Sequence, residues 1–403
     1  MGVWEEQGLE VARGMVFVKK RNKDAVSICH FGHKRVPSRE GGIEIVVEEL
    51  AKRQVRMGCD VVCYNRSGHH VSGKQFDGEK LNEYEGIKLR SVCTIDRKGL
   101  AAVTSSFFAS LKAAVGNCDV VHIHAEGPAA FCWIPKLFGK KVICHNHGID
   151  WKRAKHGNFG CKFIKFGEKC SVKYADEIIV LSEGIQNYFW ETYGRKTVLI
   201  PNGVNRTERK SEHEITDRWN LEKDSYILFL GRLVPEKGLR YLVEAYGELN
   251  TEKKLVIAGG SSDTDDFVEE LKESCKAFQD RVIFTGFVQG EILDELYSNA
   301  YVYVLPSDLE GMPLSLLEAM SYGNCCVVSD IDECASVVED KRTNAYKAVI
   351  FRKGNAVELR EKLQALCDDE HLVQQYKEEA ADFICSKYNW DDVVEKVMEV
   401  YRS

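Results

Sequence analysis

The chain has 403 residues, of which 44% are hydrophobic, and it carries a formal net charge of -7. This length and apolar content predict two domains, and the acidic balance argues against a nucleic-acid-binding protein, because such proteins normally present a basic face. The first residues include Glu5, Glu6 and Glu10 where a signal peptide would be basic and then apolar, and no apolar run of about 18 residues occurs. We therefore expect a cytoplasmic protein with reduced, buried cysteines, since its 15 cysteines include no C-x-x-C pair.

Short β-rich runs alternate with longer segments of helical period along most of the chain. This pattern predicts an α/β protein with parallel sheets that are covered by helices on both faces. Residues 1–24 precede the first strand and contain little to bury, so we expect a poorly ordered extension there. Residues 25–205 form the predicted first domain. Its expected strands are Val26–Phe31, Asp60–Asn65, Val120–His124, Lys141–His145, Glu177–Leu181 and Thr197–Ile200.

The pattern breaks in a polar stretch over residues 205–223, and we place the linker near residues 201–211. It restarts in the predicted second domain, residues 206–384. Residues 385–403 contain a predicted helix with its apolar side chains on one face. The expected strands of the second domain are Tyr226–Leu230, Lys254–Ala258, Val282–Thr285, Ala300–Leu305, Cys325–Ser329 and Tyr346–Phe351.

The segment 306–320 opens a helix directly after one of these strands. Pro313 suits the first turn of that helix, so the free backbone amides around it should point out of the carboxyl end of the strand. Such a position can bind an anion. The amides belong to Gly311, Met312 and Leu314.

Two carboxylates accompany this helix. Glu310 precedes it, and Glu318 lies about a turn and a half inside it, so they offer hydrogen-bond acceptors at different depths along one ligand. A sugar hydroxyl and a ribose need such acceptors. The alternative is a capped helix with two solvated acids.

Two cations follow the strand predicted at 226–230. The strand ends at Gly231, and Arg232 and Lys237 lie on the loop before the next helix, where they could neutralise a diphosphate. The alternative is a surface loop with a solvated arginine and lysine. A weaker signal is the pair Gly41 and Gly42 after the first strand, which permits close approach by a ligand or by a facing domain, although such pairs often form a plain turn.

Four motifs together resemble the retaining glycosyltransferases of family 4, which have the GT-B fold. They occur in the family's order at predicted strand ends, and the resemblance covers about residues 26–401. It implies two Rossmann-like, doubly wound domains that face each other across a cleft. The motifs are the Gly41-Gly42 loop, Ile200–Val204, Gly231-Arg232-x4-Lys237-Gly238 and Glu310-x7-Glu318.

The resemblance also implies an activity. A hexosyl-type sugar would pass from a nucleotide-sugar donor to a glycan or polyprenyl-linked glycan acceptor, with retention of anomeric configuration and without a metal ion or other cofactor. Arg232 and Lys237 would hold the donor diphosphate, Glu310 would contact the transferred sugar and Glu318 the ribose. His147 would line the catalytic cleft, and the final helix would cross back onto the first domain.

Two further segments narrow the resemblance. Residues 147–155 and 173–177 are similar to the branch that builds bacterial capsule, exopolysaccharide and O-antigen chains, including rhamnosyltransferase-like members. Ser336 departs from the family, because many relatives carry an acidic residue before the following Val-Val pair. Two alternatives stay open, namely a nucleotide-sugar epimerase of similar fold and a non-catalytic subunit that supports a partner transferase.

Two kinds of pattern suggest a metal ion, and neither predicts one here. The sequences Asp-x-Asp at 263–265 and 330–332 resemble the metal motif of the other large glycosyltransferase fold, but they do not lie where that fold needs it. The pairs His122-x-His124 and His145-x-His147 each share one face of a strand. Without a clear third ligand, we expect packed or cleft-lining histidines and no metal site.

The segment 158–173 predicts an amphipathic helix with a basic edge. It can rest on an anionic membrane, where a lipid-linked acceptor would lie, or its apolar face can pack into the first domain; both readings stay open. The apolar face contains Phe159, Phe163, Phe166 and Cys170, and the basic stripe contains Lys162, Lys165, Lys169 and Lys173.

Overall fold

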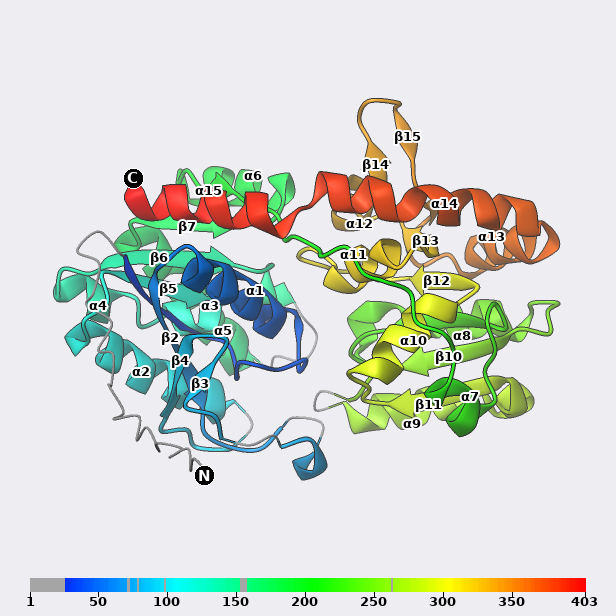
Figure 1. Ribbon diagram of the computed structural model, residues 1–403, viewed down its shortest axis with the longest axis horizontal. Coiled ribbons are helices and arrows are strands. Elements are labelled where there is room, and N and C mark those ends of the chain that lie inside the picture. Colours follow the sequence, from blue (N-terminus) through cyan, green and yellow to red (C-terminus); the bar gives the residue numbers. More distant parts are fainter. Residues whose placement is uncertain (1–25, 71–72, 78–79, 98, 153–157, 262–263) are drawn as a thin grey trace, which may run out of the picture.

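The computed structural model describes residues 26–403, except for 71–72, 78–79, 98, 153–157 and 262–263. The predicted extension over residues 1–24 lies outside this description. Figure 1 shows two α/β halves side by side, with the C-terminal helices running along one side of both. Each half contains a sheet of mainly parallel strands, which confirms the predicted α/β class.

The first sheet contains β1 (Ser27–Phe31), β2 (Asp60–Arg66), β3 (Glu83–Tyr84), β4 (Ile87–Val92), β5 (Val120–His124), β6 (Lys141–Asn146), β7 (Glu177–Val180) and β8 (Val198–Leu199). Their spatial order is β3-β4-β2-β1-β5-β6-β7-β8, and every neighbouring pair is parallel except β3 with β4. The order reverses between β1 and β5. This half is therefore doubly wound, with its switch point between these two strands.

The second sheet contains β9 (Tyr226–Leu230), β10 (Lys254–Ala258), β11 (Val282–Gly286), β12 (Val302–Leu305), β13 (Cys325–Ser329) and β16 (Val349–Phe351). All of its pairs are parallel, in the order β11-β10-β9-β12-β13-β16. The switch point lies between β9 and β12. A short hairpin, β14 (Glu339–Asp340) with β15 (Ala345–Tyr346), projects beside this sheet.

Helices join successive strands in both halves (Figure 1). Those that follow strands of the first sheet are α1 (Gly42–Arg56), α2 (Leu100–Val115), α3 (Glu126–Ala129), α4 (Trp133–Leu137), α5 (Asn158–Tyr174) and α6 (Glu183–Tyr193). Those of the second half are α7 (Glu214–Trp219), α8 (Leu239–Gly247), α9 (Asp265–Ser274), α10 (Glu291–Asn299), α11 (Leu314–Ser321), α12 (Asp332–Val338), α13 (Ala356–Asp368) and α14 (Glu370–Lys387). The central strands are buried on both faces, which explains why they are mainly apolar, although β1 and β5 also carry buried histidines.

Several elements differ from the prediction. The hairpin strands β14 and β15 were not expected, and the strand expected at Tyr346–Phe351 begins at Val349. The strands β3 and β4 were not expected, although the residues of β4 from Ile87 to Leu89 alternate buried and exposed, as in a strand with one covered face. The helix α7 occupies part of the polar stretch 205–223. It has six residues and buries only Ile215, so it is too short to show a helical period in the sequence.

The last helix, α15 (Trp390–Arg402), returns from the second half to pack on α1 (Figure 1). A Cβ on Gly203 would lie 2.6 Å from the Trp390 ring, so the chain can cross the indole only at a glycine. The Gln54 amide of α1 donates to the Tyr401 hydroxyl over 3.1 Å. The helix α15 therefore connects the second half to the first by packing on α1.

Candidate active site

The carboxyl ends of the parallel strands bring the predicted site residues to one edge of each sheet. The segment after β1 leads to Gly41 and Gly42, the loop after β9 holds Arg232 and Lys237, and the loop after β12 holds Glu310. These strands flank the two switch points, which is where doubly wound sheets bind ligands.

The two edges face each other across a close contact. A Cβ on Gly311 would lie 1.9 Å from the carbonyl oxygen of His147, and one on Gly42 would lie 3.1 Å from Cδ1 of Leu314. The first approach is open only to a residue without a side chain. Of the two readings for the paired glycines, the structure therefore shows approach by the facing domain at Gly42. Gly41 is the extended N-cap of α1.

The cation and the acid of two separate motifs meet at this edge. The Lys237 ammonium donates to Oε1 of Glu310 over 2.5 Å, and the Ser307 hydroxyl donates to the same oxygen over 2.6 Å. The two charged side chains are only 12% and 9% exposed. A buried pair of this kind keeps both side chains in place, because breaking it would leave a charge without a partner. The sequence indicated Lys237 and Glu310 but not Ser307.

The loop after β9 is held against its neighbours. The Gly231 amide donates to the Ala258 carbonyl over 3.0 Å, and the Leu233 amide donates to the Gly260 carbonyl over 3.0 Å. Arg232 lies between these two anchored residues and is half-buried. The backbone therefore restricts where its guanidinium can reach.

The second acid, Glu318, forms an ion pair across the domains. Oε1 lies 3.0 Å from Nη1 of Arg39, and Oε2 accepts a bond of 3.4 Å from the Tyr297 hydroxyl. Burial raises the pKa of the Glu318 carboxyl, and the positive charge of Arg39 offsets part of that rise. Sequence reasoning did not assign a role to Arg39 or Tyr297. Arg39 begins the motif of the paired glycines, but nothing in that motif indicates a partner 279 residues away.

The helix α11 starts one residue later than the sequence predicts. Pro313 is its N-cap, with φ -78° and ψ 96°, and Leu314 is the first helical residue. The fixed φ of proline suits both positions, so composition alone does not separate them. The first amides of the helix have no partner within it, and they face the same edge as Glu310. The Met312 sulfur accepts from the Asn202 amide over 3.0 Å, which ties this loop to the chain between the domains.

The last predicted site residue, His147, follows β6 and is 8% exposed. Its Nε2 lies 3.1 Å from Nδ1 of His124, and its ring stacks on that of His145 at a centroid distance of 4.3 Å. The expectation of packed or cleft-lining histidines describes both pairs. The structure adds His30 from β1 to the same cluster.

Known proteins resemble both halves of the chain. A model of Glycosyltransferase Family 4 matches residues 40–208, and a model of Glycosyl transferases group 1 matches residues 211–383. The chain is 28% identical over 395 residues to an uncharacterized glycosyltransferase of Methanocaldococcus jannaschii, which covers 90% of this chain and 94% of that protein. It is 25% identical over 391 residues to an alpha-maltose-1-phosphate synthase of Mycolicibacterium smegmatis, covering 91% and 96%.

Solved structures show the same fold. The HepE protein of Anabaena in complex with UDP and glucose superposes with a TM-score of 0.76 at 16% identity, covering 93% of this chain and 99% of that chain. A sucrose-phosphate synthase of Thermosynechococcus elongatus gives a TM-score of 0.74 at 19% identity, covering 94% and 98%. The expected fold is confirmed, whereas the rhamnosyltransferase-like branch stays a prediction. The chain is a glycosyltransferase with the GT-B fold, built from a family 4 domain followed by a group 1 domain.

Proposed function

We propose that the enzyme transfers a hexosyl residue from a nucleoside-diphosphate sugar to a glycan or polyprenyl-linked glycan, with retention of configuration and without a metal ion at the donor site. The observation that carries this proposal is the meeting of Lys237 and Glu310 beside the second switch point. The complex of Anabaena HepE with UDP and glucose supports a nucleotide-sugar donor, because HepE shares the fold over 93% of this chain.

The donor diphosphate would lie between the loop after β9 and the start of α11. Arg232 and Lys237 supply two positive charges, and the amides around Leu314 supply the positive end of a helix. These groups are fixed before the reaction, so they stabilise the negative charge that grows as the diphosphate leaves. A divalent cation is not required if the protein provides this charge itself.

The two acids would act at different ends of the donor. Glu310 is held by Lys237 and Ser307, close to the diphosphate position, and would contact the transferred sugar. Glu318 lies deeper along α11 and would accept hydrogen bonds from the ribose. Arg39 occupies that position in this structure, so donor binding would exchange an ion pair with Arg39 for hydrogen bonds to the ribose hydroxyls.

We infer retention because Glu310, the acid beside the diphosphate-binding helix, is assigned to the donor sugar and not to the acceptor on the opposite face. If the leaving diphosphate takes the proton of the acceptor hydroxyl, the new bond forms on the face that the diphosphate leaves. The product then keeps the anomeric configuration of the donor.

A membrane surface would supply the lipid-linked acceptor. The helix α5 buries Ile164 and Cys170 but leaves Phe159 83% and Phe166 53% exposed, so the predicted apolar face is only partly packed. The lysines of the basic stripe (Lys162, Lys165, Lys169 and Lys173) are all exposed.

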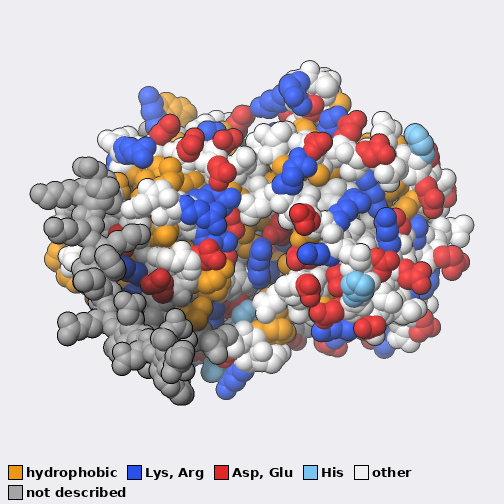
Figure 2. Space-filling view, viewed as in Figure 1, with side chains coloured by type: hydrophobic (Ala, Val, Ile, Leu, Met, Phe, Trp, Pro, Cys, Tyr) orange, Lys and Arg blue, Asp and Glu red, His pale blue; other side chains and the backbone are white. Residues whose placement is uncertain are grey.

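The exposed phenylalanines and lysines of α5 lead us to infer peripheral contact with an anionic membrane at its cytoplasmic face. Figure 2 shows hydrophobic side chains among charged ones on the visible part of the first half, whereas charged side chains of both signs cover much of the second. Among the described residues, no helix is both long enough and apolar enough to cross a membrane.

Replacing either donor-site cation should slow transfer. We expect Arg232→Ala and Lys237→Ala each to lower kcat/KM at least about tenfold, because each removes charge that stabilises the leaving diphosphate. The matched control is Lys272→Ala, which removes an exposed lysine of the same half and should leave the rate unchanged. Steady-state kinetics on folded variants would reject the diphosphate assignment if both rates matched that of the control.

Transfer should proceed at its full rate when excess EDTA is added at the start of the assay. The expected reason is that Arg232, Lys237 and the amides of α11 provide the charge that a metal ion provides elsewhere. The measurement is the initial rate of product formation with and without the chelator. Loss of transfer that magnesium or manganese restores would contradict metal independence at the donor site.

The new glycosidic bond should have the anomeric configuration of the donor. Proton NMR of freshly formed product reports this through the anomeric coupling constant, before mutarotation mixes the anomers. Inversion would contradict the assigned roles and would direct attention to His147 or Asp150 as a general base. The same experiment without acceptor tests the epimerase alternative, which predicts an altered sugar nucleotide in the absence of transfer.

Charge on α5 should control binding to vesicles. We expect a variant with Gln at Lys162, Lys165, Lys169 and Lys173 to sediment less with anionic vesicles, while its affinity for the donor stays the same, because attraction to the surface scales with local basic charge. The control carries Gln at four exposed lysines of the second half, namely Lys272, Lys276, Lys341 and Lys353. Equal sedimentation of the two variants would return α5 to a purely structural role.

A further inference from the structure

Five histidines occupy one face of the first sheet at its carboxyl edge. His30 on β1 lies opposite His122 on β5, and His124 on β5 lies opposite His145 on β6. Because side chains two residues apart on a strand share a face, this register places all four on one face, and His147 extends the row. None of the five is more than 8% exposed.

The hydrogen bonds of this cluster are incomplete. Buried polar atoms in proteins are nearly always paired, and each exception requires an explanation. Here, Nε2 of His122 and both ring nitrogens of His145 are buried without a hydrogen-bond partner among the described residues. Three imidazole nitrogens of this row are therefore unpaired among the described residues, and one of them belongs to His122 on β5.

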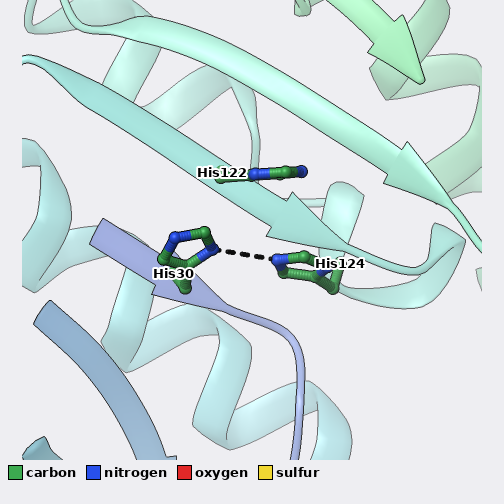
Figure 3. Close-up of side chains that lie close together, drawn as sticks. All are labelled: His30, His122 and His124. Carbon is green, nitrogen blue, oxygen red and sulfur yellow. Dashed lines mark hydrogen bonds between the residues drawn. The ribbon is translucent and has the colours of Figure 1, made fainter. Parts of the chain in front are cut away.

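Three of the rings are close enough to bind one ion. His30, His122 and His124 each offer a nitrogen, and these nitrogens lie within 4.8 Å of one another (Figure 3). Nδ1 of His30 is 3.1 Å from Nε2 of His124. In a tetrahedral zinc site with Zn–N bonds of about 2.0–2.1 Å, the nitrogens are about 3.3 Å apart, so the nitrogens of His30 and His124 already have nearly this spacing.

The outward nitrogens of the three rings are already held. Nε2 of His30 lies 2.8 Å from Oε1 of Gln54, Nδ1 of His122 lies 2.5 Å from the Tyr401 hydroxyl, and Nδ1 of His124 lies 3.1 Å from His147. Histidines that bind a metal usually have their second nitrogen fixed in this way by a carbonyl or another polar group. The nitrogens that could bind an ion are Nε2 of His122, which has no partner among the described residues, and Nδ1 of His30 and Nε2 of His124, which would exchange their mutual hydrogen bond for the ion.

We propose that His30, His122 and His124 bind one divalent first-row transition-metal ion, with a water molecule in the fourth position. Imidazole ligands suit zinc, copper and nickel, and the absence of a carboxylate from this triad disfavours calcium and magnesium. The ion lies on the first sheet and not beside Lys237 and Glu310, so we assign it no part in the proposed sugar transfer. It links β1 and β5 through the Gln54 and Tyr401 side chains to α1 and α15. This inference does not depend on the proposed sugar transfer.

Metal titration of the full-length chain tests the proposal. Protein stripped with a chelator should bind about one equivalent of Zn²⁺ or Co²⁺ and gain thermal stability, as a ligand of the folded state does. Mass spectrometry of the dialysed protein measures the metal content. The Co²⁺ complex should give the visible absorption of a tetrahedral site with nitrogen ligands. A sulfur-to-cobalt charge-transfer band would assign the ion to some of the 15 cysteines and would overturn the proposal.

Variants locate the site. His30→Gln and His122→Gln should each lose stoichiometric binding, and Tyr401→Phe, a milder change that removes only a supporting hydroxyl, should bind at least about tenfold more weakly. The control is His371→Gln, since His371 is exposed on α14.

Three results would overturn the proposal. The first is that the wild-type chain contains no metal as purified and binds none after it has been stripped. Another is equal affinity in Tyr401→Phe and the control, which remains informative if the histidine variants do not fold. The third is loss of binding in His145→Gln but not in His30→Gln, because that would assign the ion to the neighbouring triad of His124, His145 and His147.

Discussion

The parallel register of the strands is the constraint on which the rest of the structure depends. Parallel strands end at one edge of their sheet, so the loops that follow them emerge there, and the switch point opens a crevice in that edge. Both halves obey this rule, and the contact of Gly311 with the His147 carbonyl turns the two edges toward each other. Residues from motifs far apart in the sequence therefore meet because their loops leave the two sheets at the facing edges.

The two ion pairs at this edge each place a cation of the candidate site beside an acid. A site that binds a diphosphate and several hydroxyls needs cations and acids together in a place largely shielded from water, where an unpaired charge is costly. Lys237 with Glu310, and Arg39 with Glu318, satisfy each other in the absence of a ligand. The second pair joins the domains, so it contributes to the contact between them.

The sequence predicted most of the strands well, but it did not predict which side chains form ion pairs and hydrogen bonds with one another. The bounds of β9, β10 and β13 agree with the predicted ones, because buried parallel strands are short apolar runs between polar turns. The short helix α7 carries too little period to recognise. Motifs indicated Lys237 and Glu310, yet the partner of Glu318 lies 279 residues away, and no local pattern encodes such a distance. The histidines show the same limit, since the pairs on β5 and β6 are visible in the sequence but the register that adds His30 is a property of the sheet.

The C-terminal helix connects these features. Tyr401 of α15 is hydrogen-bonded to Gln54 of α1, Gln54 to His30, His30 to His124, and His124 to His147 at the cleft. Each of these bonds is buried, where a missing partner costs more than it does in water. The chain of bonds begins on a helix that enters from the second half and ends at a residue against which Gly311 of that half packs. A displacement of α15 would thus break the bonds of Tyr401 to Gln54 and His122, which lie at the opposite end of this chain of bonds from His147.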